Sequence, residues 1–377
     1  MRFISADWIF PLFKDPIKNG VVQISELGEI IEVFSSKDRL SFKQIEVYNG
    51  IICPGFINAH CHLELSHLHN LYNKGSDFID FIKIVKKRDL FSKDQIYKSI
   101  RNAENQMIKN GIVAVGDICN TSDTIDQKKK ANLQYRNLLE VFQVNNEKVE
   151  ETVNKAKLLK SQFVSENLNV NIVPHSSYSV TPKLMSRIKD MLSEESSIFS
   201  IHMQETIYEK KLFKDKTGPL KDWLISIDAD PTIWESFTSP LHSISQINSN
   251  NILLVHNTYK EKKCNSNYYY CTCPNSNLLL GSKLPNYNLF DIERLCVGTD
   301  SLASNDKLSV LDELLTIQSN SNFSLETLLK IASKNGAKAL NFNKLGTFEK
   351  GMIPGINLLQ NIKNFELTEE SKVVKLL

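Results

Sequence analysis

The sequence lacks long hydrophobic runs and any strong excess of one charge. No window approaches the roughly 20 apolar residues that a membrane-spanning helix needs, and residues 1–13 lack the charged and apolar segments of a secretory signal. The formal net charge is +2, from 45 basic and 43 acidic residues, and the run Lys128-Lys129-Lys130 is interpreted as a solvated loop. We therefore expect neither a membrane nor nucleic acid among the partners of this protein.

The cysteines lack the paired spacing of a disulfide framework. Their number is odd, seven, and several of them lie in apolar, strand-like runs, among them Cys53 and Cys296. Buried reduced thiols are typical of a reducing compartment, so we expect a cytoplasmic protein. The group of Cys264, Cys271 and Cys273 lacks the gap between paired zinc ligands, and no second pair follows. A thiolate zinc site is therefore not favoured.

The chain divides into a central part and two terminal parts. Its 377 residues are enough for one large core with a small appendage. Residues 1–50 show short strand-like runs with polar turns, whereas from residue 51 onward apolar runs alternate with stretches of helical spacing. We predict that residues 1–50 and 345–377 form one small β-sandwich domain around a barrel domain over residues 51–344.

Eight strand candidates lie in the central part, which is the number of strands in a (β/α)8 TIM barrel. They cover residues 51–60, 112–117, 136–142, 170–175, 198–203, 252–256, 268–273 and 295–300. Between them, apolar residues at helical spacing, such as Phe78, Phe81, Ile82 and Val85 behind a Ser76 cap, predict helices that coat the barrel. The predicted fold class is therefore α/β.

The strongest local signal is a His-x-His pair, His60 and His62, in the segment PGFINAHCH at the end of the first predicted strand. Side chains two residues apart in a strand point to the same side, so the two imidazoles can converge on one metal at the mouth of a barrel. Alone, the pair is weak evidence, because two polar residues at a strand end fit the same pattern.

Three further strands end in residues of the same kind. His202 and His256 each end an apolar run, Asp300 ends a third, and Glu205 follows His202 by three positions. A single histidine at a strand end is more often structural than functional. Four strand ends that carry histidine or aspartate favour a shared site at the C-terminal mouth of the barrel.

Together these segments resemble the motifs of the amidohydrolase superfamily, in particular its chlorohydrolase and aminohydrolase branch. That branch includes adenosylhomocysteine, guanine, cytosine and aminofutalosine deaminases. The resemblance is carried by PGFINAHCH, His202-x-x-Glu205, His256, CPNSN at residues 273–277 and GTDS at residues 298–301. The motifs occur in the family's order from about residue 20 to about residue 360, and GTFEKG at residues 346–351 is similar to the family's return to its β domain.

The resemblance implies one divalent metal and a carboxylate that shuttles protons. The metal ligands would be His60, His62, His202 and Asp300, and the shuttle would be Glu205. For His256 two roles are open, because the matching histidine is a ligand in some members and hydrogen-bonds the water in others; we favour the second. The fourth strand ends in VPH at residues 173–175, with no lysine that could bridge two metals, which favours a single metal.

These residue types suit hydrolytic chemistry. Imidazoles with a carboxylate bind zinc, which we favour, and also iron, and either metal lowers the pKa of bound water to about 7. Asp300 can take or orient the proton of that water, while Glu205 protonates the substrate and then the leaving amine. The predicted function is the deamination of a small aminated heterocycle by a metal-activated water, with a nucleobase or a nucleoside-like molecule such as aminofutalosine as substrate.

Two residues are predicted to contact the substrate. His175, in the segment PHSSYS, resembles a histidine that contacts the substrate in several deaminases, although two serines replace the usual small residue and proline. Glu64 faces the substrate on one interpretation and is a surface or capping carboxylate on the other. The loops expected to set specificity are residues 65–76, 176–183 and 206–223, and the last of these carries Phe213 and Trp223 as candidate covers of the pocket.

Three other functions compete with deamination. Hydrolysis of a cyclic amide or of a chloro substituent uses the same attack of water on an sp² carbon. An inactive scaffold protein would be expected to lack a ligand or the proton shuttle, yet both are present. A nucleic-acid deaminase would need a Cys-x-x-Cys signature and a basic face, which the sequence lacks. Many barrels of this family are dimers, so a homodimer is compatible with the resemblance.

Overall fold

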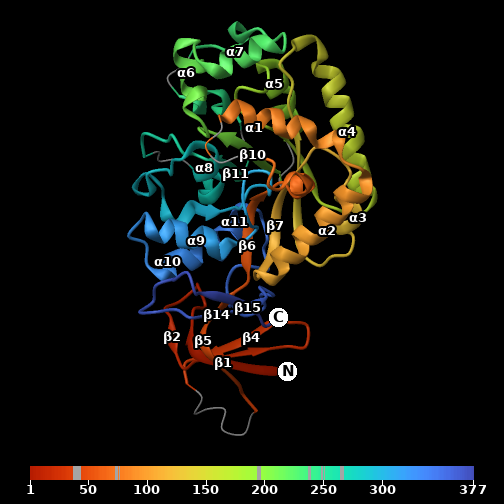
Figure 1. The fold of residues 1–377 in the computed structure, drawn as a ribbon. Coiled ribbons are helices and arrows are strands. Elements are labelled where there is room, and N and C mark those ends of the chain that lie inside the picture. Colours follow the sequence, from red (N-terminus) through yellow and green to blue (C-terminus); the bar gives the residue numbers. More distant parts are fainter. Residues whose placement is uncertain are drawn as a thin grey trace.

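The computed structural model describes residues 1–36, 44–72, 75, 77–192, 197–236, 239–247, 249, 251–263 and 267–377. A sheet that contains both chain ends lies at one end of the molecule, and helices α6 and α7 lie at the other (Figure 1). Strands and helices alternate through the part between them (Figure 1). This alternation makes the chain an α/β protein, as its sequence predicts.

The terminal sheet has seven strands from both ends of the chain, in the order β15-β14-β5-β1-β3-β4, with β2 paired to β1. Its strands are β1 (Arg2–Ile9), β2 (Ile17–Lys18), β3 (Val21–Ile24), β4 (Ile30–Phe34), β5 (Glu46–Pro54), β14 (Ile356–Gln360) and β15 (Lys372–Lys375). Its apolar core includes Ile4, Val22, Ile52 and Phe348, all fully buried. Antiparallel pairing of β14 with β5 joins the C-terminal segment to the N-terminal one.

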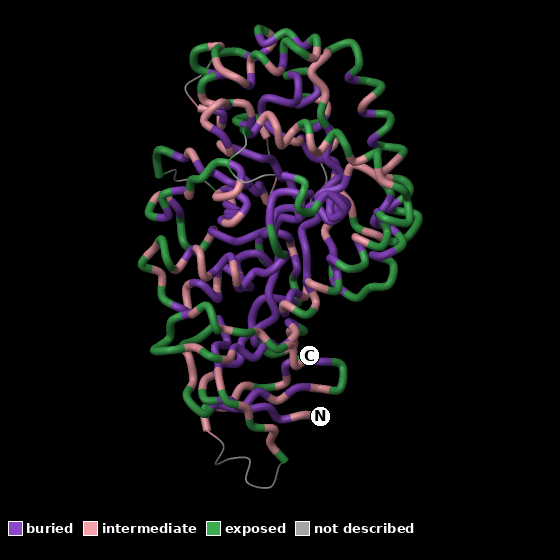
Figure 2. Tube along the Cα trace, viewed as in Figure 1, coloured by how far each residue is buried: buried purple, intermediate pink, exposed green. Residues whose placement is uncertain are grey.

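The central part holds two four-stranded parallel sheets, in the orders β6-β7-β8-β9 and β10-β11-β12-β13. The strands are β6 (Phe56–Cys61), β7 (Ile112–Cys119), β8 (Gln134–Val141), β9 (Val170–Pro174), β10 (Ile198–Met203), β11 (Asn251–His256), β12 (Tyr269–Thr272) and β13 (Leu295–Val297). Nearly every residue of β6, β10 and β13 is buried, because helices cover the parallel strands. Figure 2 shows this buried centre with the exposed residues around it.

The two parallel sheets meet at both of their edges. On one side the backbone N–H of His202 donates to the carbonyl of His175 at 2.9 Å. On the other side the N–H groups of Thr299 and Asp300 donate to the carbonyl of His60 at 3.1 and 3.0 Å. These bonds fix the positions of four polar strand ends relative to one another.

The predicted strand over residues 51–60 is wrong as one element, because the chain turns at Gly55. Before the turn β5 pairs with β14, and after it β6 pairs with β7, in a different sheet. A Cβ at Gly55 would lie 2.4 Å from a methyl group of Val113 and 2.7 Å from the carbonyl oxygen of Pro354. The close approach requires glycine, and the continuous apolar run conceals the break.

The α-helices connect or pack against the parallel strands. They are α1 (Phe78–Val85), α2 (Lys93–Lys109), α3 (Ile125–Lys128), α4 (Val149–Ser165), α5 (Pro182–Met191), α6 (Ile207–Asp215), α7 (Pro219–Ser226), α8 (Pro274–Gly281), α9 (Val310–Ser319), α10 (Leu325–Leu329) and α11 (Gly336–Ala339). A π-helical stretch over Lys330–Asn335 joins the last two. Asp77 caps α1 by accepting from the N–H of Ile79, and the predicted cap Ser76 lies outside the described residues.

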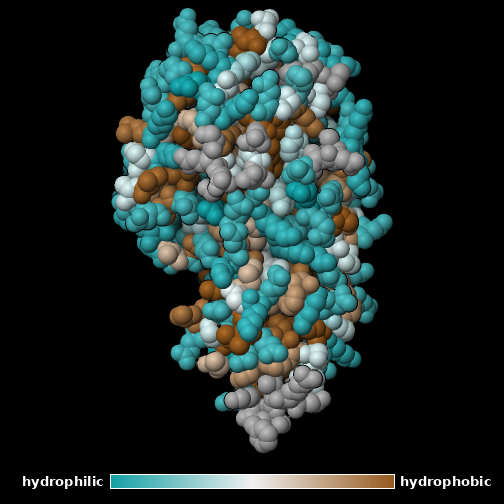
Figure 3. Space-filling view, turned by 180° about the vertical axis from the view of Figure 1, so that it is seen from behind, coloured by the Kyte–Doolittle hydropathy of each residue, from teal (hydrophilic) through white to brown (hydrophobic). Residues whose placement is uncertain are grey.

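No described helix is both long and apolar enough to cross a membrane. The face in Figure 3 is mostly hydrophilic over the central part, with hydrophobic residues scattered singly or in small groups. Six of the cysteines are described, and all six are buried free thiols; Cys264 lies outside the described residues.

The expectation that Lys128 lies in a solvated loop is wrong. Lys128 ends α3 with its side chain fully buried, and its Nζ lies 2.5 Å from Oδ2 of Asp117 on β7. Lys129 and Lys130 are exposed, in agreement with the prediction. A run of three lysines does not show that one of them faces a buried carboxylate.

Candidate active site

Three histidines converge at the C-terminal ends of two strands from different sheets. His60 lies in β6, His62 follows it, and His202 lies in β10. The Nε2 atom of His62 is 3.2 Å from that of His60 and 3.3 Å from that of His202. All three side chains are buried. These three residues form a group that could hold a metal ion.

The protonation of these rings suits a cation better than mutual hydrogen bonding. Nδ1 of His202 lies 2.8 Å from the carbonyl oxygen of His175, a pure acceptor, so Nδ1 carries the hydrogen and Nε2 presents its lone pair. Burial lowers the pKa of His60 to about 3 and that of His62 well below its usual value. Neutral imidazoles with lone pairs this close together are the arrangement that a divalent metal requires.

Asp300 completes this group from the opposite edge of the second sheet. Its Oδ1 lies 3.7 Å from Nε2 of His60 and 3.5 Å from Nε2 of His62. Its Oδ2 accepts hydrogen bonds from the hydroxyls of Ser276 and Ser304, both at 2.7 Å. Burial opposes ionisation, yet the bond to His60 and the nearby His62 hold the pKa of Asp300 well below its usual value. Asp300 is therefore a buried carboxylate that stays ionised.

Glu205 and His256 lie beside each other next to the three histidines. Oε1 of Glu205 is 3.6 Å from Nε2 of His256, which has no hydrogen-bond partner in the described structure. Nδ1 of His256 lies 2.9 Å from Oδ1 of Asn277, in the segment CPNSN. Burial raises the pKa of Glu205 to about 7. A carboxyl group with this pKa can both give and take a proton near neutral pH.

Left-handed backbone conformations occur at three residues of the site. The φ angles are 54° at Gln204, 70° at His256 and 58° at Asp300. Residues other than glycine rarely adopt such angles, and strain of this kind is concentrated at functional sites. The backbone thus turns sharply where the strands deliver these side chains.

A cavity of about 200 Å³ opens onto this cluster. One wall is polar and includes His62, His175, His202, Glu205 and Asp300. The apolar part of the lining includes Phe78, Phe81, Ile82 and Val85 of α1, Phe142 after β8 and Trp223 of α7. A flat, mostly apolar ring with polar edge atoms matches this division.

The two predicted substrate contacts lie in different surroundings. His175 lines the cavity, and its Nδ1 is within 3.0 Å of the hydroxyl of Ser176 and 2.9 Å of that of Ser179. Glu64 is not among the cavity-lining residues. Its Oε1 accepts from Arg88 at 2.8 Å, and its Oε2 accepts from the backbone and hydroxyl of Thr121.

Of the two aromatic residues expected to cover the pocket, the structure brings only Trp223 to the cavity wall. Phe213 is fully buried in an apolar cluster with Tyr178 and Trp234. Phe213 lies on the face of α6 that packs into this cluster. The sequence alone does not show which face of α6 is covered, so it could not place Phe213 away from the cavity.

Sequence reasoning missed Glu140, which lies in β8 and lines the cavity. Burial raises the pKa of this carboxyl group to about 7. The signal was present as a charged residue inside the apolar run LLEVF. A strand over residues 136–142 was predicted, but the pattern does not show that Glu140, near the C-terminal end of β8, faces the cavity.

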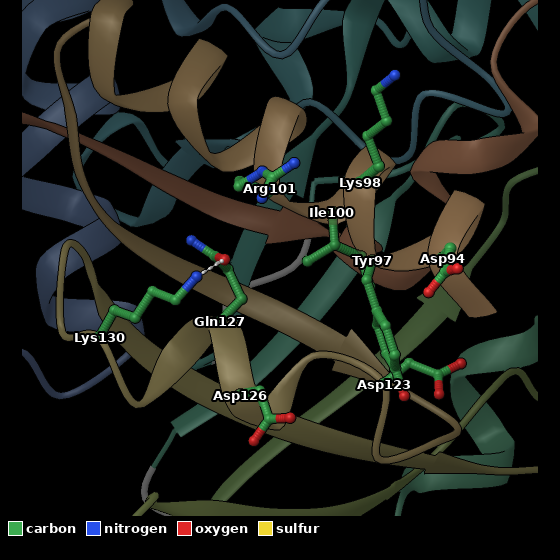
Figure 4. Close-up of a pocket in the computed structure, with 9 residues that line it drawn as sticks. All are labelled: Asp94, Tyr97, Lys98, Ile100, Arg101, Asp123, Asp126, Gln127 and Lys130. Carbon is green, nitrogen blue, oxygen red and sulfur yellow. Dashed lines mark hydrogen bonds between the residues drawn. The ribbon is translucent and has the colours of Figure 1, made fainter.

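A second hollow, of about 430 Å³, lies on the outside of the molecule between α2 and the start of α3. Figure 4 shows the side chains that line it, which come mainly from these two elements, with Lys130 donating to Gln127 at 2.7 Å. The lining contains no histidine and no cysteine. This hollow therefore lacks the convergent metal ligands of the cavity above.

This chain is similar in sequence to known proteins. The model of the amidohydrolase family matches residues 51–377. The chain is also similar to an adenosine deaminase of Helicobacter pylori, with 27% identity over 347 residues that cover 86% of this chain and 83% of that protein.

Solved structures show the same fold. The Helicobacter pylori aminofutalosine deaminase in complex with methylthio-coformycin matches with a TM-score of 0.79 and 23% identity, over 99% of this chain and 97% of that one. An atrazine chlorohydrolase from Arthrobacter aurescens complexed with zinc matches with a TM-score of 0.75 and 16% identity, over 98% and 90%.

Proposed function

Because this chain belongs to the amidohydrolase family, we propose that it is a metal-dependent hydrolase that removes the amino group of a small aminated heterocycle of the adenosine type. One observation carries the proposal. The Nε2 atoms of three neutral histidines meet beside the ionised Asp300, and Glu205 lies within the same cavity. Hydrolysis at an sp² carbon needs metal ligands beside a carboxyl group whose pKa lies near neutral pH.

We assign the metal to His60, His62, His202 and Asp300, and we favour zinc over iron. Imidazole nitrogens with one carboxylate oxygen suit zinc, and the chlorohydrolase of similar fold was solved with zinc. When bound at this site, a divalent metal lowers the pKa of a water molecule and so supplies a nucleophile at neutral pH.

The side chains of the protein then move protons and hold the substrate. Asp300 accepts the proton of the attacking water, because it is ionised before the reaction and its Oδ2 is fixed in place by two serines. Glu205 gives a proton to a ring nitrogen of the substrate, which makes the adjacent carbon electrophilic. It then takes the proton of the hydroxyl on the attacked carbon, as that carbon becomes a carbonyl, and gives it to the departing amine. The proton held by Asp300 returns to Glu205 and restores both groups. His256 orients the water from its unpartnered Nε2, and His175 contacts the substrate from the polar wall.

The substrate class follows from the cavity and the relatives. The apolar wall of α1 with Trp223 suits a planar ring, and one relative, 27% identical to this chain, is an adenosine deaminase. Aminofutalosine is one substrate of this class, since a deaminase for it shares the fold. The contact of Glu64 with the substrate stays a prediction; both of its oxygens already have protein partners, which favours a structural role.

The same family membership supports a closed (β/α)8 barrel. Hydrogen bonds from His202 to His175 and from Asp300 to His60 join the two parallel sheets at their edges. The sequence predicts barrel bounds of residues 51–344 and a β-sandwich domain of residues 1–50 and 345–377. We propose that the barrel begins after Gly55, because residues up to Pro54 pair with β14 in the terminal sheet.

We also propose that the enzyme acts in the cytoplasm, where its buried free thiols would stay reduced. The expectation of a homodimer stays a prediction, as does the absence of nucleic acid among its partners.

The experiment that tests the proposed function is ammonia release by zinc-loaded protein across aminated purines, pyrimidines, pterins and their nucleosides. Glu205→Gln is the matched control, because it keeps the size of the side chain and removes its acid. Release from an adenosine-type compound that stops in the control supports the proposal. Zinc-loaded protein that releases no ammonia but cleaves a cyclic amide or a chlorinated ring contradicts it.

A further inference from the structure

One buried carboxylate at the cavity has no role in the account above. Glu140 reaches the cavity from β8, and its side chain is 4% exposed. Its Oε2 accepts a hydrogen bond from the side chain of Asn120 at 3.3 Å, but its Oε1 has no hydrogen-bond partner in the described structure. A buried carboxylate oxygen without a partner is costly, so a compensating charge is expected nearby.

The nearest group to this oxygen belongs to a metal-ligand histidine. Oε1 of Glu140 lies 3.4 Å from Nδ1 of His202. The hydrogen on Nδ1 points to the carbonyl of His175 at 2.8 Å, so Glu140 flanks this N–H rather than accepting from it directly. No lysine or arginine forms an ion pair with Glu140 among the described residues. Glu140 thus lies against the side of the His202 ring that faces away from His62. Glu140, His175 and His202 also present ligand atoms within 4.8 Å of one another.

The position of Glu140 is that of a group behind a metal ligand. Its Oε1 lies on the Nδ1 side of the His202 ring, whereas Nε2 of the same ring faces His62 in the cluster. Carboxylates behind metal-bound histidines fix the ring orientation and strengthen the metal–nitrogen bond.

We propose that Glu140 is a positioning residue for the metal site, which holds the ring of His202 from its Nδ1 side. The inference rests on the metal site of the proposed function but not on the substrate or the reaction. The inference gives a reason for the charged residue inside the apolar run LLEVF, which is support of the metal site. Asn120 holds the carboxylate of Glu140 in place by donating a hydrogen bond to Oε2.

The test is the zinc affinity of the purified protein, measured by competition with a chromophoric chelator. We expect Glu140→Gln and Glu140→Ala to bind zinc about 10- to 100-fold more weakly than the wild type. Asn120→Ala, which leaves the carboxylate in place, is expected to lose only a few-fold. Glu104→Gln is the matched control, because Glu104 is a fully buried carboxylate on α2 that contacts Gln127, Asn132 and Tyr135 and no metal-ligand residue.

A second measurement separates positioning from general damage to the fold. The visible spectrum of the cobalt-substituted protein is expected to change in Glu140→Gln and not in Glu104→Gln, because only the first alters the ligand field. Thermal unfolding of the metal-free variants shows whether each one folds. If Glu140→Gln does not fold, Asn120→Ala carries the test.

The outcomes are distinguishable from a failure of the proposed function. Zinc affinities of both Glu140 variants within twofold of the wild type overturn this inference, even if the enzyme deaminates its substrate. Weakened zinc binding together with no deamination supports the inference and contradicts the proposed reaction. A wild type that holds no zinc overturns both.

Discussion

Lys128 Nζ lies 2.5 Å from Asp117 Oδ2, and both side chains are fully excluded from solvent. The other oxygen of Asp117 accepts the backbone N–H of Leu63 at 2.8 Å. Leu63 directly follows His62, so this buried ion pair fixes the backbone just after β6, where His60 and His62 are positioned. Lys128 also lies over the rings of Tyr135 and Phe163, at 5.0 and 5.5 Å.

Removing the cation of this pair is expected to destabilise the protein strongly. Lys128→Met leaves the charge of Asp117 buried and unpaired, which costs about 3–5 kcal/mol. The control is Lys129→Met in the same run, because Lys129 pairs with Glu166 at the surface, where such pairs contribute about 1 kcal/mol or less. Urea unfolding measures both variants, and equal losses of stability would contradict the buried role of Lys128.

Metal content is expected to depend on the converging histidines and not on buried histidines in general. His60→Ala removes one of the three Nε2 atoms of the cluster, so the variant is expected to retain little zinc after dialysis. His67→Ala is the matched control, since His67 is also buried but packs against Phe91 outside the cluster. Elemental analysis measures the number of zinc ions per protein molecule in each variant. The same zinc content in both variants would refute the assigned metal site.

Stability is expected to fall as the pH rises, because buried carboxyl groups keep their protons in the folded state. Burial raises the pKa of Glu313 to about 8 from its ordinary 4.5. Its contribution to stability is therefore fully present below about pH 4.5 and is lost as the pH rises to about 8, with a slope of up to about 1.4 kcal/mol per pH unit.

The variant Glu313→Gln isolates this effect. It is expected to be less stable at low pH, because the amide cannot accept from both Asn275 and Asn305, but to show a flatter pH dependence. Urea unfolding of the metal-free protein at several pH values between about 5 and 8 measures the slope. Parallel curves for wild type and variant would show that Glu313 ionises normally.

Substrate affinity is expected to depend on the apolar wall. Trp223→Ala removes the ring that faces the cavity from α7, so KM should rise about tenfold with little change in kcat, the pattern of a contact equally strong in the bound substrate and the transition state. Ile225→Ala on the same helix is the control, because Ile225 is 51% exposed and does not line the cavity. A drop in kcat alone would place Trp223 in the reaction rather than in binding.

The sequence predicted the site better than it predicted the element boundaries. His202, His256 and Asp300 each end a short apolar run, and the ends of parallel strands share one edge, so their neighbourhood followed from local pattern alone. The division of the first predicted strand did not follow. The residues on both sides of Pro54 and Gly55 are apolar, and only the close approach of Val113 and Pro354 shows that the chain turns there.

Residues whose role depends on distant partners could not be predicted. The pairing of Lys128 with Asp117 depends on how α3 packs against β7. Without knowledge of that contact, a run of lysines is predicted to be exposed to solvent. Glu140 was hidden because a single charge inside an apolar run does not reveal that the strand ends beside it. In both cases the missing information is the position of a partner in another element.

Reaction in water enriched in oxygen-18 tests the central claim, the replacement of an amino group by an oxygen atom from water. Zinc-loaded enzyme and an adenosine-type substrate are predicted to give one ammonia for each product molecule, with the heavy oxygen at the carbon that lost nitrogen, as measured by mass spectrometry. Product without the label, or ammonia and product in unequal amounts, would contradict hydrolytic deamination at this site.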